Sequence, residues 1–208
     1  MQALICVVSD SKKGTSSTAG MQRTVETSPL LQYRIKDVVP SRMEAIIEAI
    51  KAKDFDTFAK ITMQDSNQFH AVALDTDPPI FYMNDTSRAI IAVVVEYNRA
   101  SLASGQGIKA AYTFDAGPNA VIYAIEENMR DLINVIHYYF PQSVPFDDPF
   151  QLFSEAPGTL TLPEGFNLAV ATKAEVGAVS RLIHTRVGDG PRVLDDSEAL
   201  LDASGLSK

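Results

Sequence analysis

The chain has 208 residues, of which 46% are hydrophobic and 21% charged. This composition is typical of a folded globular protein and excludes global disorder, and the length provides enough apolar material for a core. The formal net charge of −8 argues against nucleic-acid binding, which usually depends on a basic surface. We therefore expect no nucleic-acid partner.

The first apolar run, residues 2–9, predicts a buried strand that contains Cys6. Cys6 is the single cysteine, so an internal disulfide is excluded. No apolar stretch approaches the about 20 residues that span a bilayer. From these features we expect a soluble protein without a membrane span, in a reducing, cytoplasmic setting.

Helical patterns dominate the next part of the chain. We expect helices at residues 18–27 and 41–53. Three more are expected to begin at N-caps: one at Ser28 with Pro29 as its first residue, one at Asp54 that extends to about residue 74, and one near Asn84 that ends before Gly105. The prolines at 78 and 79 separate the last two. The β-branched residues 93–95 leave a strand possible within the last segment.

Residues 41–53 carry the clearest periodic signal. Met43, Ile46, Ile47 and Ile50 follow i, i+3, i+4, i+7 spacing and predict one apolar face. We expect that face to be buried in the protein's own core, because any globular helix needs one. The alternative is that this helix binds a partner.

The second half of the chain begins with a predicted hairpin. Residues 108–114 and 121–125 are expected as strands around the turn residues Gly117, Pro118 and Asn119. A helix at 126–139, a long surface connection at 141–163, a strand at 178–187 and a loose tail from about 194 complete the chain. This order favours an α+β fold in a single domain, 1–208, with helices packed on one face of an antiparallel sheet.

Asp115 lies at the start of the hairpin turn, next to small residues. A carboxylate there can approach a ligand closely while the flanking strands hold its backbone. The alternative is that Asp115 only caps the turn, because aspartate is a common turn residue.

Five blocks resemble the diphosphomevalonate decarboxylase family of the galactokinase, homoserine kinase and mevalonate kinase superfamily. They are residues 16–21 (SSTAGM), 25–31 (VETSPLL), 65–71 (DSNQFHA), 75–80 (DTDPPI) and 112–120 (YTFDAGPNA), in family order. The family's C-terminal domain has the α+β architecture described above. Family members are about twice as long, and the resemblance implies that their N-terminal half, with a phosphate-binding loop and a catalytic arginine, is missing here.

The resemblance implies an ATP-dependent decarboxylation of mevalonate diphosphate to isopentenyl diphosphate, with Mg²⁺, in isoprenoid and sterol synthesis. Asp115 would be the catalytic carboxylate, the base or orienting group for the substrate hydroxyl. Ser17 and Thr18 would bind the substrate diphosphate, although both can also be ordinary helix N-caps. Family members are homodimers, and most of the nucleotide site is expected in the missing half.

The remaining polar residues give weaker signals. Asn67 and His70 are three positions apart and would line one side of a helix, either near the cleft or as satisfied structural side chains. His137 and His184 stand in apolar segments without metal-ligand spacing, so we interpret both as structural and expect no metal site.

Three interpretations remain open for the whole chain. The first is an active decarboxylase, and the second is a non-catalytic half that dimerises or binds a partner. The third is a truncated gene product, with the activity belonging to a longer protein. An exposed apolar edge at residues 2–8 would favour partner binding.

Overall fold

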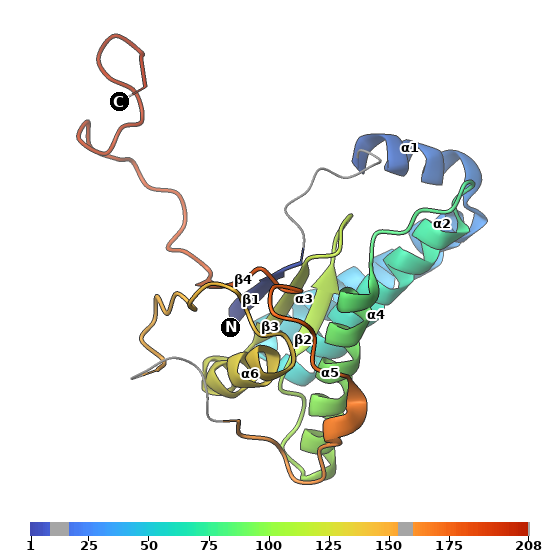
Figure 1. Cartoon of the computed structure of the whole chain (residues 1–208). Coiled ribbons are helices and arrows are strands. Elements are labelled where there is room, and N and C mark those ends of the chain that lie inside the picture. Colours follow the sequence, from blue (N-terminus) through green and yellow to red (C-terminus); the bar gives the residue numbers. More distant parts are fainter. Residues whose placement is uncertain (9–16, 154–159, 208) are drawn as a thin grey trace.

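The computed structural model describes residues 1–8, 17–153 and 160–207, except for the side chain of Ser17. The elements in chain order are β1 (Gln2–Val7), α1 (Ser17–Thr27), α2 (Pro29–Tyr33), η1 (Arg34–Val38, a π-helix), α3 (Val39–Ala52), α4 (Phe55–Asp75), α5 (Asp85–Ala103), β2 (Ala111–Phe114), β3 (Ala120–Ala124), α6 (Glu126–Tyr139), η2 (Leu168–Val170, a 3-10 helix) and β4 (Arg181–Arg186). Figure 1 shows their arrangement. Among these helices none is long and apolar enough to cross a membrane.

Within the described residues the strands form one antiparallel sheet in the order β2-β3-β1-β4. Leu4 of β1 lies opposite Ile122 of β3 on one side and His184 of β4 on the other. β1 is therefore an inner strand rather than an exposed edge at residues 2–8, and β2 is an edge strand.

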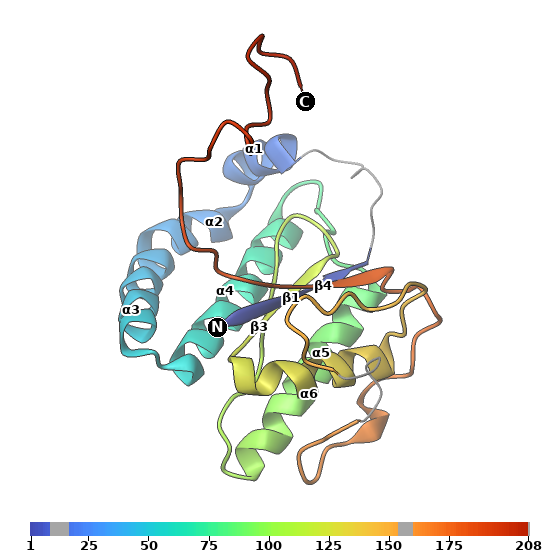
Figure 2. The same ribbon diagram turned by 90° about the vertical axis from the view of Figure 1, so that its left-hand side faces the viewer.

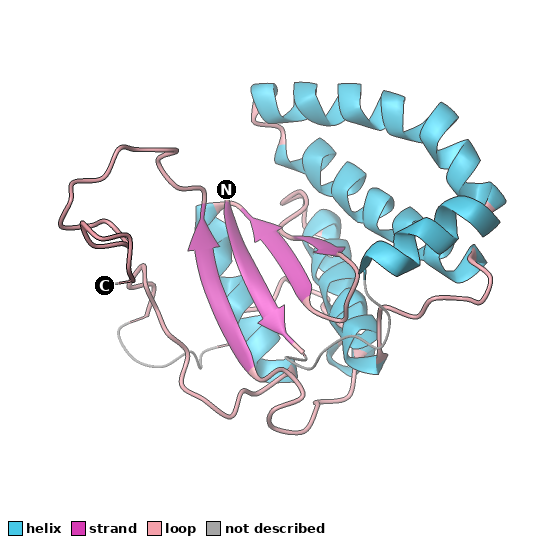
Figure 3. Ribbon diagram, turned by 90° about the horizontal axis from the view of Figure 1, so that it is seen from above, coloured by secondary structure: helices cyan, strands magenta, loops and turns pink. Residues whose placement is uncertain are grey.

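Helices α5 and α6 cover one face of the sheet, as Figure 3 shows from above. The core between them contains Leu4, Cys6, Ile122, Ile90, Val94, Tyr97, Met129, Leu132, Ile133 and Ile136, all at most 1% exposed. The predicted α+β class is confirmed. The alternative of a strand at 93–95 is wrong, because these residues belong to α5 and two of them, Val93 and Val94, are buried by the core.

The predicted N-caps at Ser28, Asp54 and Asn84 are confirmed. The Ser28 hydroxyl accepts the Leu31 N–H before α2, and Asp54 Oδ1 accepts the Thr57 N–H before α4. Asn84 begins α5 in a reciprocal capping box with Ser87.

Helix α4 packs against the edge strand β2, and α3 packs on α4. Figure 2 shows this group of helices beside the sheet. The prediction of a buried apolar face on α3 is wrong: Met43, Ile47 and Ile50 are 53%, 42% and 57% exposed. The residue of α3 that is buried is Ala49, so α3 meets the body of the protein along a narrow strip and leaves most of its apolar stripe in solvent.

Candidate active site

Asp115 directly follows the last residue of β2, at the start of the turn to β3. Its backbone carbonyl accepts a hydrogen bond from the Gly117 N–H at 2.8 Å, while its side chain is exposed. The turn geometry therefore fixes the backbone of Asp115 and leaves the carboxylate accessible.

Two other elements hold the same turn. The Ser87 hydroxyl, at the start of α5, donates to the Pro118 carbonyl at 2.8 Å. The Val8 N–H, just after β1, donates to Asn119 Oδ1 at 2.8 Å. The residues around Asp115 are thus tied to both a helix and the central strand.

Helix α4 contacts β2 through polar side chains. The Phe114 N–H donates to the Ser66 hydroxyl at 3.0 Å, and the Tyr112 hydroxyl donates to Asn67 Oδ1 at 3.1 Å. As predicted, Asn67 and His70 lie three positions apart on a helix, α4. Asn67 is exposed, and its Oδ1 accepts the hydrogen bond from Tyr112.

His70 differs, because its Nε2 atom is buried without a hydrogen-bond partner among the described residues. Burial lowers the pKa of His70, while a hydrogen bond with the Phe114 backbone and the negative charge of Asp115 oppose that effect. His70 is 5% exposed, so its imidazole is expected to be neutral at physiological pH.

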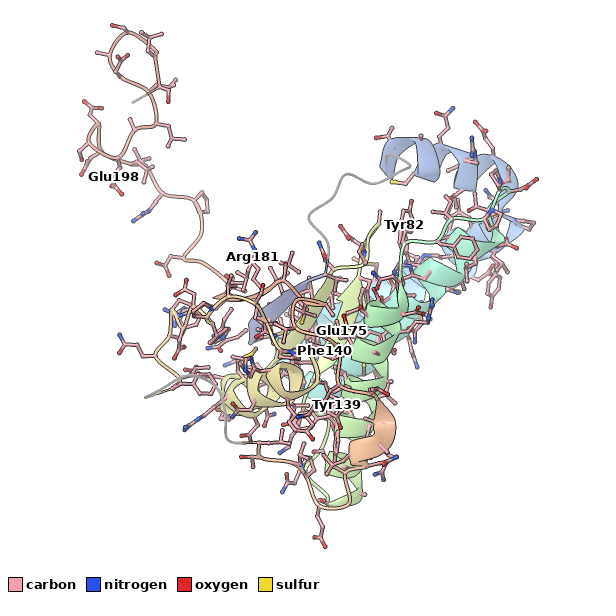
Figure 4. All side chains as sticks on the ribbon, viewed as in Figure 1. Tyr82, Tyr139, Phe140, Glu175, Arg181 and Glu198 are labelled. Carbon is pink, nitrogen blue, oxygen red and sulfur yellow. The ribbon has the colours of Figure 1, made fainter. Side chains whose placement is uncertain are left out.

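Tyr82 completes the surroundings of Asp115. It lies on the connection between α4 and α5, where Figure 4 labels it. Burial raises the pKa of Tyr82, and the charge of Asp115 raises it further. The ring centroids of Tyr82 and His70 are 6.2 Å apart, in an edge-to-face arrangement. Asp115 therefore shares its neighbourhood with a neutral imidazole and a protonated phenol.

Comparisons with known proteins identify the family. The family model described as the mevalonate 5-diphosphate decarboxylase C-terminal domain matches residues 3–194. A diphosphomevalonate decarboxylase from Ganoderma lucidum is 65% identical over 208 residues, which are 100% of this chain and 52% of the relative. The chain belongs to the mevalonate 5-diphosphate decarboxylase family. The resemblance inferred from the sequence is thereby confirmed.

Solved structures agree with this assignment. Mevalonate diphosphate decarboxylase from Trypanosoma brucei is 33% identical with a TM-score of 0.80, over 96% of this chain and 52% of that one. A structure of MDDEF in complex with MVAPP, AMPPCP and magnesium is 31% identical with a TM-score of 0.59, over 67% of this chain and 41% of that one. The chain thus spans about half the length of the decarboxylases that it matches.

The structure gives partial information on the predicted diphosphate site. Ser17 is the first residue of α1, but its side chain lies outside the described part of the chain, as do residues 9–16. Thr18 is exposed in the first turn of α1. In Figures 1 and 2, α1 and the β2–β3 turn lie toward the same end of the molecule. The helix α1 and the turn between β2 and β3 are therefore on the same side of the domain.

Sequence reasoning missed a cluster of two arginines, an aspartate and a glutamine beneath α3. Arg34 binds Asp65 through two hydrogen bonds of 2.7 and 2.8 Å, and Arg42 approaches the same carboxylate at 3.0 Å. Both arginines also donate to Gln68 Oε1 at 2.8 Å. Arg34 and then Arg42 lower the pKa of Asp65 by these bonds, against the opposing effect of burial. The cluster borders a cavity of about 300 Å³ between α3, α4 and β2.

The cluster gave a weak sequence signal. Asp65 and Gln68 are three positions apart on a predicted helix and so face one way, but nothing local shows which arginines they meet. The hydrogen bonds of the cluster join η1 and α3 to α4 and so fix the helices that lie beside β2.

Proposed function

We propose that this chain is the C-terminal half of an ATP-dependent diphosphomevalonate decarboxylase. The overall reaction converts mevalonate diphosphate and ATP into isopentenyl diphosphate, carbon dioxide, ADP and phosphate. The observation that carries the proposal is the Asp115 turn, where an exposed carboxylate stands on a backbone held from α5, β1 and α4. Rigid placement of a reacting group is a main source of catalysis.

Asp115 acts on the tertiary hydroxyl of the substrate. Its carboxylate hydrogen-bonds that hydroxyl and accepts or polarises the proton as the oxygen attacks the γ-phosphorus of ATP. The attack displaces ADP and forms a phosphate ester. The phosphate group then leaves with the C–O electron pair, while the electron pair of the bond to the carboxylate forms the double bond as carbon dioxide is lost. The neighbouring imidazole of His70 is neutral and does not add a competing charge.

Ser17 and Thr18 bind the substrate diphosphate in this proposal. The positive end of a helix dipole attracts anions, and Ser17 and Thr18 stand at that end of α1. α1 has eleven residues and is anchored to the end of α4 by a 2.9 Å hydrogen bond between the hydroxyls of Thr24 and Thr76. The protein carries net negative charge, so an anionic substrate depends on such a local site.

ATP and Mg²⁺ are the proposed cosubstrate and ion, in line with the analogue and magnesium named for MDDEF. Mg²⁺ is usually bound largely through nucleotide phosphates and water, with one or two carboxylates. The described residues hold no group of three or more His, Cys, Asp or Glu side chains that could bind a metal. We therefore assign no magnesium ligand to this chain and derive no step through the ion.

The same family membership supports the remaining parts of the proposal. We infer a cytoplasmic homodimer that serves isoprenoid and sterol synthesis. Size measurement by ultracentrifugation and location of a tagged copy in cells would test these two properties separately.

Turnover is the direct test of the proposed reaction. Purified chain is incubated with mevalonate diphosphate, ATP and Mg²⁺, and the release of carbon dioxide and phosphate is followed. The matched control is Asp115→Asn, which keeps the shape of the side chain and removes its negative charge. Turnover that disappears in this variant supports the proposal, whereas no turnover from folded chain excludes independent catalysis.

An alternative function is a dimerisation or partner-binding module without activity of its own. The exposed stripe of Met43, Ile47 and Ile50 on α3 favours it, because monomeric proteins rarely leave a continuous apolar helix face in water. The inner position of β1 removes the other expected sign, an exposed edge at residues 2–8.

Sedimentation measurements of the association state of two α3 variants test the dimerisation alternative. Ile47→Glu places a charge in the centre of the stripe, and Ala45→Glu places the same charge on an exposed residue of α3 outside it. Association that is lost only in Ile47→Glu supports a docking face. A monomer at all concentrations in the unmodified chain would exclude self-association through α3.

A further inference from the structure

The sequence blocks 25–31 and 75–80 contain no residue of the candidate site, yet they lie against each other in the structure. Residues 25–31 span the end of α1 and the start of α2, and residues 75–80 begin at the last residue of α4. The end of α4 therefore meets the junction between α1 and α2.

Asp75, the last residue of α4, binds the start of α2. Its Oδ2 atom accepts the Ser28 hydroxyl at 2.7 Å and the Leu30 N–H at 3.2 Å. Ser28 is 3% exposed, so its residue is shielded from water. Leu30 belongs to the first turn of α2, where backbone N–H groups have no partner within the helix. One carboxylate oxygen thus binds both a buried hydroxyl and the first turn of a helix.

Thr27, the last residue of α1, binds the other side of the junction. Its hydroxyl donates to the Arg23 carbonyl at 2.8 Å and accepts the Asp77 N–H at 2.9 Å. Three residues earlier, the Thr24 hydroxyl lies 2.9 Å from the hydroxyl of Thr76, a residue that is 2% exposed. These bonds connect the end of α1 to the segment that directly follows α4.

The polar joint between residues 75–77 and the α1–α2 junction has little apolar packing around it. Met21 and Val25 of α1 are 62% and 60% exposed. A cavity of about 270 Å³ lies between α1, α2, η1 and α4. Because α1 has no packed apolar face, the hydrogen bonds of the joint set its direction relative to α4.

Helix α4 carries the joint at its end and contacts the strand before Asp115 nearer its middle. The Ser66 hydroxyl accepts the Phe114 N–H at 3.0 Å, and Asp75 lies nine residues farther along the helix. Nine residues of an α-helix span about 14 Å. One helix therefore connects the turn that carries Asp115 to the base of α1.

We propose that Thr27 and Asp75 are positioning residues that fix the direction of α1 on α4. Through α1 they set where Ser17 and Thr18 stand relative to Asp115. The substrate carries its hydroxyl and its diphosphate at separate positions, so the groups that bind them need a common rigid support. The inference rests on the proposed function only for its effect on substrate binding.

Two pairs of variants separate the hydrogen bonds of the joint from side-chain volume. Thr27→Val keeps the branched shape and loses the acceptor for the Asp77 N–H, whereas Thr27→Ser keeps the hydroxyl. Asp75→Ala loses the carboxylate, whereas Asp75→Asn keeps an oxygen that can accept both bonds now made to Oδ2. Gln22→Ala is the control on α1, because it deletes the exposed 3.1 Å bond to Glu26 and leaves the joint intact.

The distance between two spin labels in the free chain measures the direction of α1. The labels are attached at Met21→Cys on α1 and Gln64→Cys on α4, which are exposed positions, while Cys6 is fully buried. We expect a broader distance distribution in Thr27→Val and Asp75→Ala, and the unmodified distribution in the two conservative variants and the control. An unchanged distribution in both loss variants would overturn the proposal, as would equal broadening in all five variants.

Kinetics then test the effect on the substrate. If the unmodified chain shows turnover that depends on Asp115, Thr27→Val and Asp75→Ala should raise KM for mevalonate diphosphate about tenfold, the effect of losing about one hydrogen bond, with little change in kcat. A purely structural role would instead lower kcat at unchanged KM, through loss of folded protein, and would overturn the positioning role. If turnover is absent, the proposed function fails, and the spin-label distances still decide whether the joint positions α1.

Discussion

The hydroxyl of Ser87 and the carbonyl of Pro118, 2.8 Å apart, join the first turn of α5 to the turn that carries Asp115. The same hydroxyl accepts the Asn84 N–H at 3.3 Å, and the Ser87 N–H donates to Asn84 Oδ1 at 3.0 Å. One buried serine therefore both starts a helix and fixes a loop of the candidate site.

Ser87→Ala is expected to lower the free energy of unfolding by about 2 kcal/mol, because the hydroxyl half of the capping box and the bond to Pro118 are lost together. Chemical denaturation monitored by circular dichroism measures this change. Ser104→Ala is the control at the C-cap of the same helix, since Ser104 is exposed and its hydroxyl donates to the Ala100 carbonyl one turn before. Equal loss in the two variants would show that the link to Pro118 adds nothing.

The elements around Asp115 could be predicted from sequence because their determinants are local. Two β-rich segments flank Gly117, Pro118 and Asn119, and these residues specify a tight turn at any place in a chain. The caps at Ser28, Asp54 and Asn84 follow the same logic, since each involves groups within a few residues.

The exposed stripe of α3 could not be predicted in the same way. Periodicity shows that Met43, Ile47 and Ile50 share a face, but it does not show what covers that face. The position of β1 depended on long-range pairing with β4, in which Leu4 meets His184. The hydrogen bond from the Phe114 N–H to the Ser66 hydroxyl likewise required the structure, because the two residues are 48 positions apart in sequence.

Buried histidines should make the fold sensitive to mild acid. Burial lowers the pKa of both His70 and His184, although Asp115 and Asp148 respectively oppose the shift. As the pH falls, these histidines therefore take up protons in the unfolded chain at a higher pH than in the folded chain. The stability of the fold that depends on their neutral form is complete above about pH 6.5 and declines below it. The loss is at most about 1.4 kcal/mol per histidine for each pH unit.

Urea denaturation at about pH 7.5 and about pH 5.5 measures this effect. The double variant His70→Phe, His184→Phe should show a flatter dependence over the same interval. A separate loss at lower pH is expected from Asp65, whose pKa is lowered first by its bond with Arg34, so that its contribution disappears as this carboxylate takes up a proton. Stability that rises on acidification from pH 7.5 would contradict the assignment of neutral buried histidines.

Asn98 is expected to be a second sensitive position. Its Nδ2 donates to the Ala110 carbonyl at 2.7 Å, and its Oδ1 accepts the N–H groups of Lys109 and Ala110 at 3.1 Å. Asn98→Ala removes the partner of three backbone groups at the entrance to β2, the two of Ala110 buried and that of Lys109 partly buried, and should cost about 3 kcal/mol of unfolding free energy. Gln106→Ala, at an exposed amide on the same connection, is the control for denaturation. A loss below about 1 kcal/mol would mean that water replaces all three bonds.

Cys6 provides a probe of the central strand. The residue is fully buried in β1, between β3 and β4, and burial raises the pKa of its thiol to about 12. The thiolate is the reactive form, so native protein should react with an aromatic disulfide reagent at about pH 8 at least a hundredfold more slowly than protein unfolded in urea. The rate measured in native protein then reports opening of the sheet. Rapid labelling in the absence of urea would show that β1 is not held between its two neighbours, and would favour the exposed apolar edge that a partner-binding half requires.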